Sequence, residues 1–147
     1  MECCSSPNPD LKSNELQAIT GVPGTSQLWA VGDYGRKGNS TLTEHWNGTT
    51  WSVVPSPNPQ PSRASFLQSV AVLSESNIWA VGFYIRNYDR TLLEHWDGSQ
   101  WTVVPSKPRY EYFRGVTHIP GTNQAWIVGQ YENLTAKTAG SLIEFYC

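Results

Sequence analysis

The chain has 147 residues, with 10 Lys and Arg against 12 Asp and Glu, so its formal net charge is -2 at pH 7. Since no basic run occurs, the electrostatic attraction that drives nucleic-acid binding is missing, and we expect no nucleic-acid partner. No stretch approaches the ~20 apolar residues of a membrane span, and the polar start at residues 1–4 lacks the apolar core of a signal peptide. We therefore expect a soluble chain with no membrane partner, and its localisation stays open.

The first nine residues align without a gap on residues 51–59. Residues 1–4 therefore predict a strand, in which Cys3 and Cys4 stand where the later copy has Val53 and Val54. We expect these cysteines to pack as small apolar side chains. A disulfide between Cys3 and Cys147 stays open, because the strand alignment does not place the two directly opposite each other.

A unit of about fifty residues then occurs three times. Its clearest mark is Trp-Ala-Val-Gly at residues 29–32 and 79–82, with Trp-Ile-Val-Gly at residues 126–129. Each unit is rich in β-branched and aromatic residues and in Pro-Gly, Asn-Gly and Asp-Gly turns, which predicts short antiparallel strands. In chain order the strand candidates are residues 16–19, 28–32, 41–46 and 51–54, then 67–70, 78–82, 91–96 and 101–104, then 113–116, 125–129 and 141–146.

The segments Trp-Asn-Gly-Thr-Thr-Trp and Trp-Asp-Gly-Ser-Gln-Trp predict tight hairpins between the last two strands of the first and second units. The tryptophans at both ends of each segment are expected to face each other across the hairpin. Both faces of the third strand carry bulky residues, with Leu92 and Glu94 on one side and Leu93 and His95 on the other. A sheet covered on both faces is typical of a propeller blade between two neighbours.

The predicted fold is therefore all-β, with three four-stranded antiparallel repeats that form blades of a β-propeller. Blade 1 covers about residues 10–55, blade 2 about residues 60–105 and blade 3 about residues 108–147, with residues 1–4 as the strand that completes the last blade. Three blades fall short of the roughly four to eight that close a ring. We expect closure by oligomerisation, most simply as a homodimer with six blades. The rival view is a piece of a longer propeller.

The repeats resemble kelch-like, galactose-oxidase-type propellers, in particular bacterial repeats that read Trp-Ala-Val-Gly and then Thr-Leu-x-Glu-His-Trp-x-Gly-x-x-Trp-x-Val-Val-Pro-Ser-Pro. The resemblance covers nearly the whole chain and is weaker in the third repeat, where Phe145 and Tyr146 replace His and Trp. It implies the propeller fold without a particular activity. The Trp-Asp-Gly-Ser-Gln-Trp hairpin is also similar to repeats of certain bacterial lectin propellers.

The Glu-His pairs at 44/45 and 94/95 are the main candidates for metal or acid–base chemistry. Adjacent strand residues point to opposite faces, so one pair cannot easily share a metal ion. We expect a structural role, with each glutamate anchoring a turn through backbone N–H groups. We therefore predict no catalytic residues, no metal and no cofactor. An oxidase of the galactose-oxidase type would need a copper set of Tyr and His that this chain is not expected to assemble.

Loops that differ between repeats are the candidate binding surface, because packing forces the repeats to match elsewhere. In a four-stranded blade, the loop after the second strand and the connection between blades share one rim. Tyr and Arg on this rim favour recognition of a glycan or a protein; the candidates are Tyr34, Arg36, Tyr84, Arg86, Tyr88, Arg109, Tyr110, Tyr112 and Tyr131. The recurring tyrosines could instead only cover the end of each blade. The expected function is a non-enzymatic binding or scaffold module, and the alternative is a self-assembling structural repeat unit without a ligand.

Overall fold

The structure is a computed structural model, which describes residues 5–35, 39–106, 110–133 and 135–146. Strands in this part of the chain form three antiparallel sheets. The first sheet contains β1 (Asn14–Gly21), β2 (Leu28–Tyr34), β3 (Ser40–Trp46) and β4 (Trp51–Val53). The second sheet contains β5 (Ala64–Ser74), β6 (Asn77–Ile85), β7 (Asp89–Trp96) and β8 (Trp101–Val103). The third sheet contains β9 (Tyr110–His118), β10 (Ala125–Asn133) and β11 (Thr138–Tyr146).

The prediction of an all-β chain with three repeated antiparallel sheets is confirmed. Within each sheet, strands that follow one another in the chain are neighbours. The predicted fourth strand of the third sheet, residues 1–4, lies outside the described residues, as does Cys147 with its expected disulfide. No helix that could cross a membrane occurs in the part of the chain that the structure describes.

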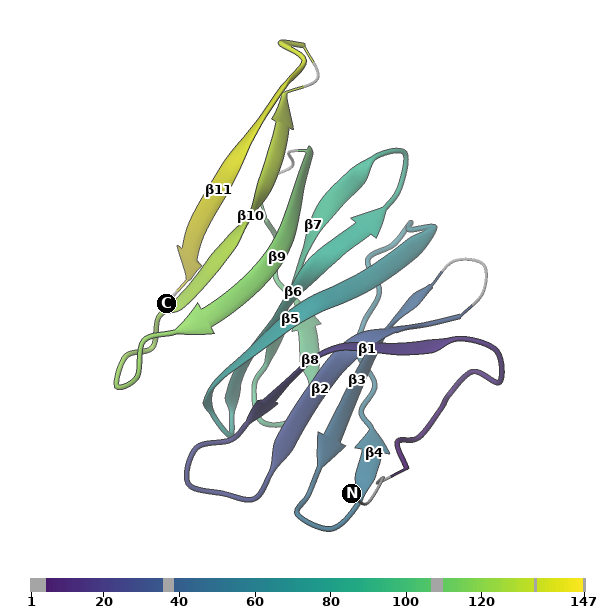
Figure 1. Cartoon of the computed structure of the whole chain (residues 1–147), viewed down its shortest axis with the longest axis vertical. Coiled ribbons are helices and arrows are strands. Elements are labelled where there is room, and N and C mark those ends of the chain that lie inside the picture. Colours follow the sequence, from purple (N-terminus) through teal and green to yellow (C-terminus); the bar gives the residue numbers. More distant parts are fainter. Residues whose placement is uncertain (1–4, 36–38, 107–109, 134, 147) are drawn as a thin grey trace.

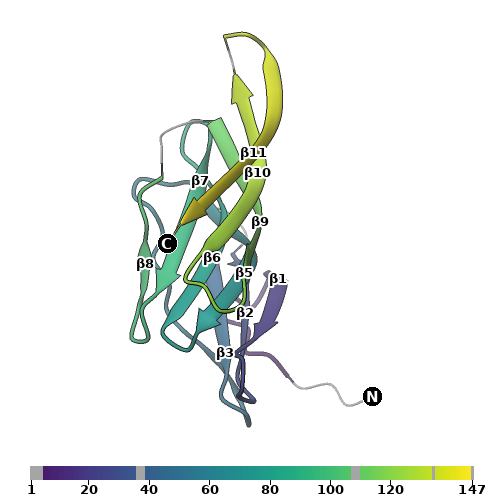
Figure 2. The same cartoon turned by 90° about the vertical axis from the view of Figure 1, so that its left-hand side faces the viewer.

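The sheets pack face to face in chain order, with the second sheet in the middle (Figure 1). Strand β5 contacts β1 and β2 on one side and β9 on the other. The segment before β1, drawn in purple, lies beside the first sheet, whereas the yellow hairpin of β10 and β11 lies at the far end of the array (Figures 1 and 2). The array is thus an arc with two open ends.

Two apolar cores fill the spaces between the sheets. The first core joins Trp29 and Val31 of the first sheet to Leu67 and Val70 of the second. The second core joins the opposite face of the second sheet, with Val81 and Leu93, to residues of the third sheet. These packed faces explain why both sides of the third strand in each repeat are bulky.

The predicted tryptophan pairs lie opposite each other across the hairpins. Trp46 pairs with Trp51, and Trp96 pairs with Trp101. The ring centroids of these pairs are 5.7 Å and 5.9 Å apart. The prediction is confirmed, and the pairs fix the last two strands of the first two sheets against each other.

The glycine that ends each Trp-x-Val-Gly segment is required by the neighbouring strand. A Cβ atom on Gly82 would lie 1.9 Å from the carbonyl oxygen of Phe66 in β5. The same overlap would occur at 1.9 Å for Gly32 and at 2.0 Å for Gly129. In all three sheets the register shifts beside this glycine, so a bulge brings the first strand onto the second. Only a residue without a side chain fits at these three positions.

Replacing Gly82 by Ala is expected to lower the free energy of unfolding by about 3 kcal/mol, because the backbone of β5 must move to admit the methyl group. Gly21→Ala is the matched control, since its Cβ would lie 3.7 Å from the nearest atom, Leu28 Cδ2. That control should change stability by less than about 0.5 kcal/mol. Urea unfolding followed by tryptophan fluorescence measures both, and equal midpoints for the two variants would contradict this account.

Candidate functional site

The strand directions place the predicted rim residues at one edge of the three sheets. Tyr34 ends β2, and Tyr84 and Tyr131 lie near the ends of β6 and β10. The loop between β6 and β7 carries Arg86 and Tyr88, both exposed. The start of β9 contributes Tyr110 and Tyr112. Arg36 and Arg109 lie outside the described residues.

Several rim tyrosines pack against the protein. Tyr84 contacts the first core. Tyr131 of β10 pairs with Gly140 of β11, and the tyrosine ring lies over this glycine. A Cβ atom on Gly140 would lie 2.6 Å from Tyr131 Cε1. Tyr112 meets the Phe83 ring edge-on, with centroids 5.8 Å apart. These contacts favour the covering role for Tyr84 and Tyr131.

Arg114, at the bulge in the middle of β9, contacts the rim residue Tyr112 and was not among the predicted site residues. Its guanidinium carbon lies 5.5 Å from the ring centroid of Tyr112 and 5.8 Å from that of Phe83. This geometry is a cation–π contact at an exposed position. The lone Arg gave no signal in the sequence, because Gln68 and Gln17 stand at the matching places in the other repeats.

The two glutamates of the Glu-His pairs are buried between structural elements instead of anchoring turns. Glu44 is fully buried, and the Ser6 hydroxyl donates a hydrogen bond to its Oε2 at 2.7 Å. Burial raises the pKa of Glu44, and the bond from Ser6 offsets part of this shift. The predicted backbone anchor is therefore replaced by a serine from the segment that precedes β1.

Glu94 is the counterpart of Glu44 in the second sheet and is buried near another serine, Ser56. Burial raises the pKa of Glu94 to about 8, and the hydroxyl of Ser56 offsets part of the rise. The hydroxyl proton of Ser56 is donated to Thr41 Oγ1 at 2.6 Å, and neither carboxyl oxygen of Glu94 has a hydrogen bond within the described residues. Ser56 thus connects the third strand of its own sheet with the buried glutamate of the next sheet.

The two histidines lie on the face opposite to the glutamates. His45 Nε2 is 2.8 Å from Gln27 Oε1, and its ring stacks on Trp29 with centroids 4.6 Å apart. His95 makes the same contacts with Asn77 and Trp79. Burial lowers the pKa of both histidines. Among the described residues, no group of three or more metal-binding side chains comes together.

The outer face of the first sheet exposes apolar side chains that the other sheets bury. Ile19 is 61% exposed, whereas Val70 at the matching place in the second sheet is 7% exposed. Leu16 is likewise exposed, whereas Leu67 is fully buried. The register places both pairs at matching points, since Leu16 lies opposite Gly32 and Leu67 opposite Gly82.

The outer face of the third sheet also exposes apolar side chains whose counterparts in the second sheet are buried. Ile143 is 67% exposed, whereas Leu93 at the matching place in the second sheet is fully buried. Val128 is half-exposed, whereas Val81 is fully buried. Phe145 is also exposed and stacks on Trp126. The arc therefore ends in two faces with exposed apolar side chains at positions that the second sheet uses against a neighbour, although on the face of the first sheet Leu42 and Glu44 are buried.

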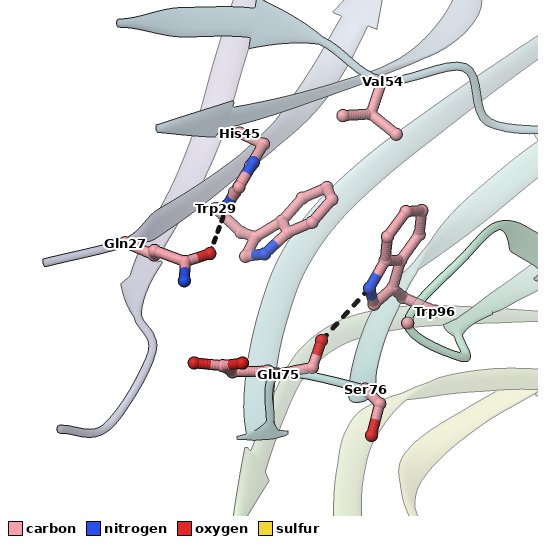
Figure 3. A pocket seen from close by; sticks show the side chains of 8 residues that line it. Gln27, Trp29, His45, Val54, Glu75, Ser76 and Trp96 are labelled. Carbon is pink, nitrogen blue, oxygen red and sulfur yellow. Dashed lines mark hydrogen bonds between the residues drawn. The ribbon is translucent and has the colours of Figure 1, made fainter. Parts of the chain in front are cut away.

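A cavity lies between the first and second sheets, at the edge opposite to the predicted rim (Figure 3). Its lining includes Gln27, Trp29, Glu75 and Trp96. The sequence analysis did not select any of these as ligand-binding residues, because they come from different turns and strands of two repeats. Their shared sequence signal is weak: Gln27, Trp29 and Trp96 lie at or next to the ends of predicted strands, and Glu75 lies between two predicted strands.

Comparison of the sequence with models of protein families gives no match, and comparison with curated proteins gives none either.

The raised pKa of Glu94 predicts that the protein loses stability as the pH rises. An unfolded glutamate ionises near its ordinary pKa of 4.5, whereas folded Glu94 stays protonated up to about pH 8. The stabilising proton is fully present below pH 4.5 and is lost as the pH rises through about 8. We expect Glu94→Gln, which keeps the shape without an ionisable proton, to lose less stability than the native protein between pH 5 and about pH 9.

Urea unfolding at both pH values measures this difference, which should be on the order of a few kcal/mol. Glu15→Gln, at an exposed position of β1, is the control and should follow the native protein. Identical pH dependence for Glu94→Gln and the native protein would show that Glu94 is not the group responsible.

Proposed function

We propose that the chain is a non-enzymatic β-propeller unit that builds a closed ring with a second copy of itself and acts as a scaffold. The observation that carries this proposal is the exposure of Ile19 and Ile143 at positions whose counterparts, Val70 and Leu93, are buried between sheets. Contiguous exposed apolar faces are typical of protein–protein contacts. Fully burying a side chain of this size stabilises an assembly by about 1.5–3 kcal/mol.

The two outer faces carry side chains at the positions through which neighbouring sheets of this chain pack on each other. The outer face of the third sheet carries Val128 and Ile143 where the second sheet carries Val81 and Leu93. The outer face of the first sheet carries Leu16 and Ile19 where the second sheet carries Leu67 and Val70. Since the second sheet uses these faces to pack against its two neighbours, the third sheet of one copy fits the first sheet of another in the same way.

The segment before β1 supports the same pairing. Ser6 donates a hydrogen bond to Glu44. In the next repeat Ser56, which lies in the connection between the first and second sheets, is the neighbour of Glu94. The segment around Ser6 thus occupies the place of a connection arriving from a preceding sheet. In the proposed ring, the preceding sheet is the third sheet of the second copy, whose Ser141 stands at the place of Thr41.

Two copies with three sheets each give six sheets, which is within the roughly four to eight blades of known propellers. Two identical contacts then close the ring about one two-fold axis. Ring closure also covers the free edge of β11, because residues 1–4 of the partner align with the fourth strands of the first two repeats.

Replacing Ile143 by Asp is expected to convert the assembly into monomers at micromolar concentration, because a carboxylate would have to be buried without a partner. Light scattering coupled to size-exclusion chromatography measures the mass, which should be that of two chains for the native protein. Val103→Asp is the matched control, since Val103 is also exposed but lies in β8 of the middle sheet, away from both end faces. It should leave the mass unchanged.

Circular dichroism checks that the Ile143 variant keeps its strands, as its exposure in the single chain predicts. A native protein that elutes as a compact monomer would refute the proposed ring. Equal loss of assembly in the Val103 variant would also speak against the end faces as the site of association.

A second candidate function is ligand recognition at the rim. It is favoured by the exposed loop with Arg86 and Tyr88 and by the exposed Arg114 on the rings of Tyr112 and Phe83. Aromatic rings with arginine are the residue types that dominate recognition surfaces. The ligand of this surface would be a glycan or a protein.

If the rim binds a glycan, Arg86→Ala and Arg114→Ala together are expected to reduce the signal of the native protein on a glycan array about tenfold or more. Thr49→Ala, an exposed polar position in the turn between β3 and β4 at the opposite edge, is the control and should retain the signal. Unchanged array binding after both arginine substitutions would remove this candidate for glycans.

A further inference from the structure

A cavity of about 390 Å³ lies between the first two sheets. This volume lies in the range of pockets that hold small ligands, roughly 300–1,000 Å³. The turns before β2 and β6 and the turn after β7 surround its opening, so the cavity lies at the edge opposite to the rim. Figure 3 shows Gln27, Trp29, Glu75 and Trp96 arranged around it.

Two indole rings form the apolar part of the wall. The centroids of Trp29 and Trp96 are 4.9 Å apart, and the ring planes are inclined by 51°. Trp96 is held in place because its Nε1 donates a hydrogen bond to the Glu75 carbonyl oxygen at 3.2 Å (Figure 3). Trp29 is 3% exposed and one of its faces stacks on His45, so Trp96 offers the larger accessible aromatic surface.

The polar part of the wall presents both donors and an acceptor. Gln27 Oε1 can only accept, so the bond from His45 Nε2 fixes the amide and leaves its NH₂ group to donate. The carboxylate of Glu75 makes no hydrogen bond or ion pair within the described part of the chain and can only accept when ionised. The Ser76 hydroxyl adds a group that both donates and accepts.

The turn after β7 completes the opening in a fixed position. Asp97 Oδ1 accepts hydrogen bonds from the backbone nitrogens of Ser99 and Gln100 at 2.8 Å and 2.9 Å. Gly98 then packs on the turn of the neighbouring hairpin, since a Cβ on it would lie 2.8 Å from Ser76 Cβ. The cavity is therefore formed in advance by hydrogen bonds within the protein, which lowers the cost of binding.

We propose that this cavity binds one pyranose unit of a neutral glycan. A sugar presents C–H groups on one face and hydroxyl groups around its edge. The C–H groups fit the electron-rich surface of Trp96, while the hydroxyl groups donate to Glu75 and accept from Gln27 and Ser76. The proposal goes beyond ring assembly, because both walls of the cavity come from one chain.

The arrangement favours a sugar over a quaternary ammonium ion, which would also be attracted by indole rings and a carboxylate. A cage for such a cation needs several open ring faces, and here the faces of Trp29 are largely covered. The amide of Gln27 and the hydroxyl of Ser76 match hydroxyl groups and have no role toward a methylated cation.

The site is specific to the first and second sheets. At the matching contact between the second and third sheets, Thr122 stands in place of Glu75 and Tyr146 in place of Trp96. Tyr146 also packs on Trp79, with centroids 5.6 Å apart. The second contact therefore lacks the carboxylate and the accessible indole on which the proposed site depends.

Saturation-transfer NMR with methyl glycosides of glucose, galactose, mannose and N-acetylglucosamine tests the site. We expect at least one of them to bind saturably to the native protein, with a Kd on the order of 1 mM. Glu75→Gln should weaken this binding about tenfold, because hydrogen bonds to a charged acceptor are the stronger ones. Glu15→Gln, an exposed carboxylate at the other edge of the first sheet, should leave the Kd unchanged.

Trp96→Tyr is the second variant, since Tyr occupies this place in the third repeat and is compatible with the fold; it should also weaken binding. Failure of every glycoside to saturate, or equal affinity of the Glu75→Gln variant and the native protein, would overturn the proposal. So would saturable binding of tetramethylammonium without any response to a sugar. Repeating the titration with Ile143→Asp separates the two proposals, because sugar binding should survive loss of the ring.

Discussion

The packing of one sheet face on the next is the interaction on which the structure depends. Each sheet meets its successor with a tryptophan and a valine from its second strand, as Trp29 and Val31 meet the side chains of Leu67 and Val70. The second sheet is covered on both sides in this way, whereas the first and third sheets are each covered on one side. The exposed faces at the two ends follow directly from this order of packing.

The sheet packing also explains where ionisable groups are tolerated. Glu44 and Glu94 are buried at the seam between a sheet and the incoming connection, where Ser6 and Ser56 supply hydroxyl groups. Burial raises the pKa of both carboxyl groups, and the value of about 8 for Glu94 keeps that group neutral near pH 7 and avoids the cost of an uncompensated charge. The histidine that follows each glutamate lies on the opposite face of the sheet. The glutamate therefore faces the incoming connection, whereas the histidine packs on a tryptophan of its own sheet.

The sequence was sufficient to predict features that depend on local pattern. Trp-Ala-Val-Gly, the Asp-Gly hairpin and the two apolar faces around Leu92 and Leu93 repeat along the chain, so strands, turns and stacked sheets could all be inferred. The serine contacts of the glutamates and the cavity could not, because Gln27, Glu75 and Trp96 meet only when two sheets are superposed. The orientation of the Tyr131 side chain could not be predicted either. Its ring lies over Gly140 on the neighbouring strand, in the space that a larger side chain at position 140 would fill.

Whether a second copy covers the end faces can be measured from the solvent accessibility of two isoleucines, Ile19 and Ile143. In a methyl-labelled sample with a soluble paramagnetic agent, Ile78 is the buried reference and Val103, in the middle sheet, is the exposed one. If the ring forms, the methyl signals of Ile19 and Ile143 keep their intensity as Ile78 does. If both lose intensity as strongly as Val103, the end faces are in contact with water and the account is wrong.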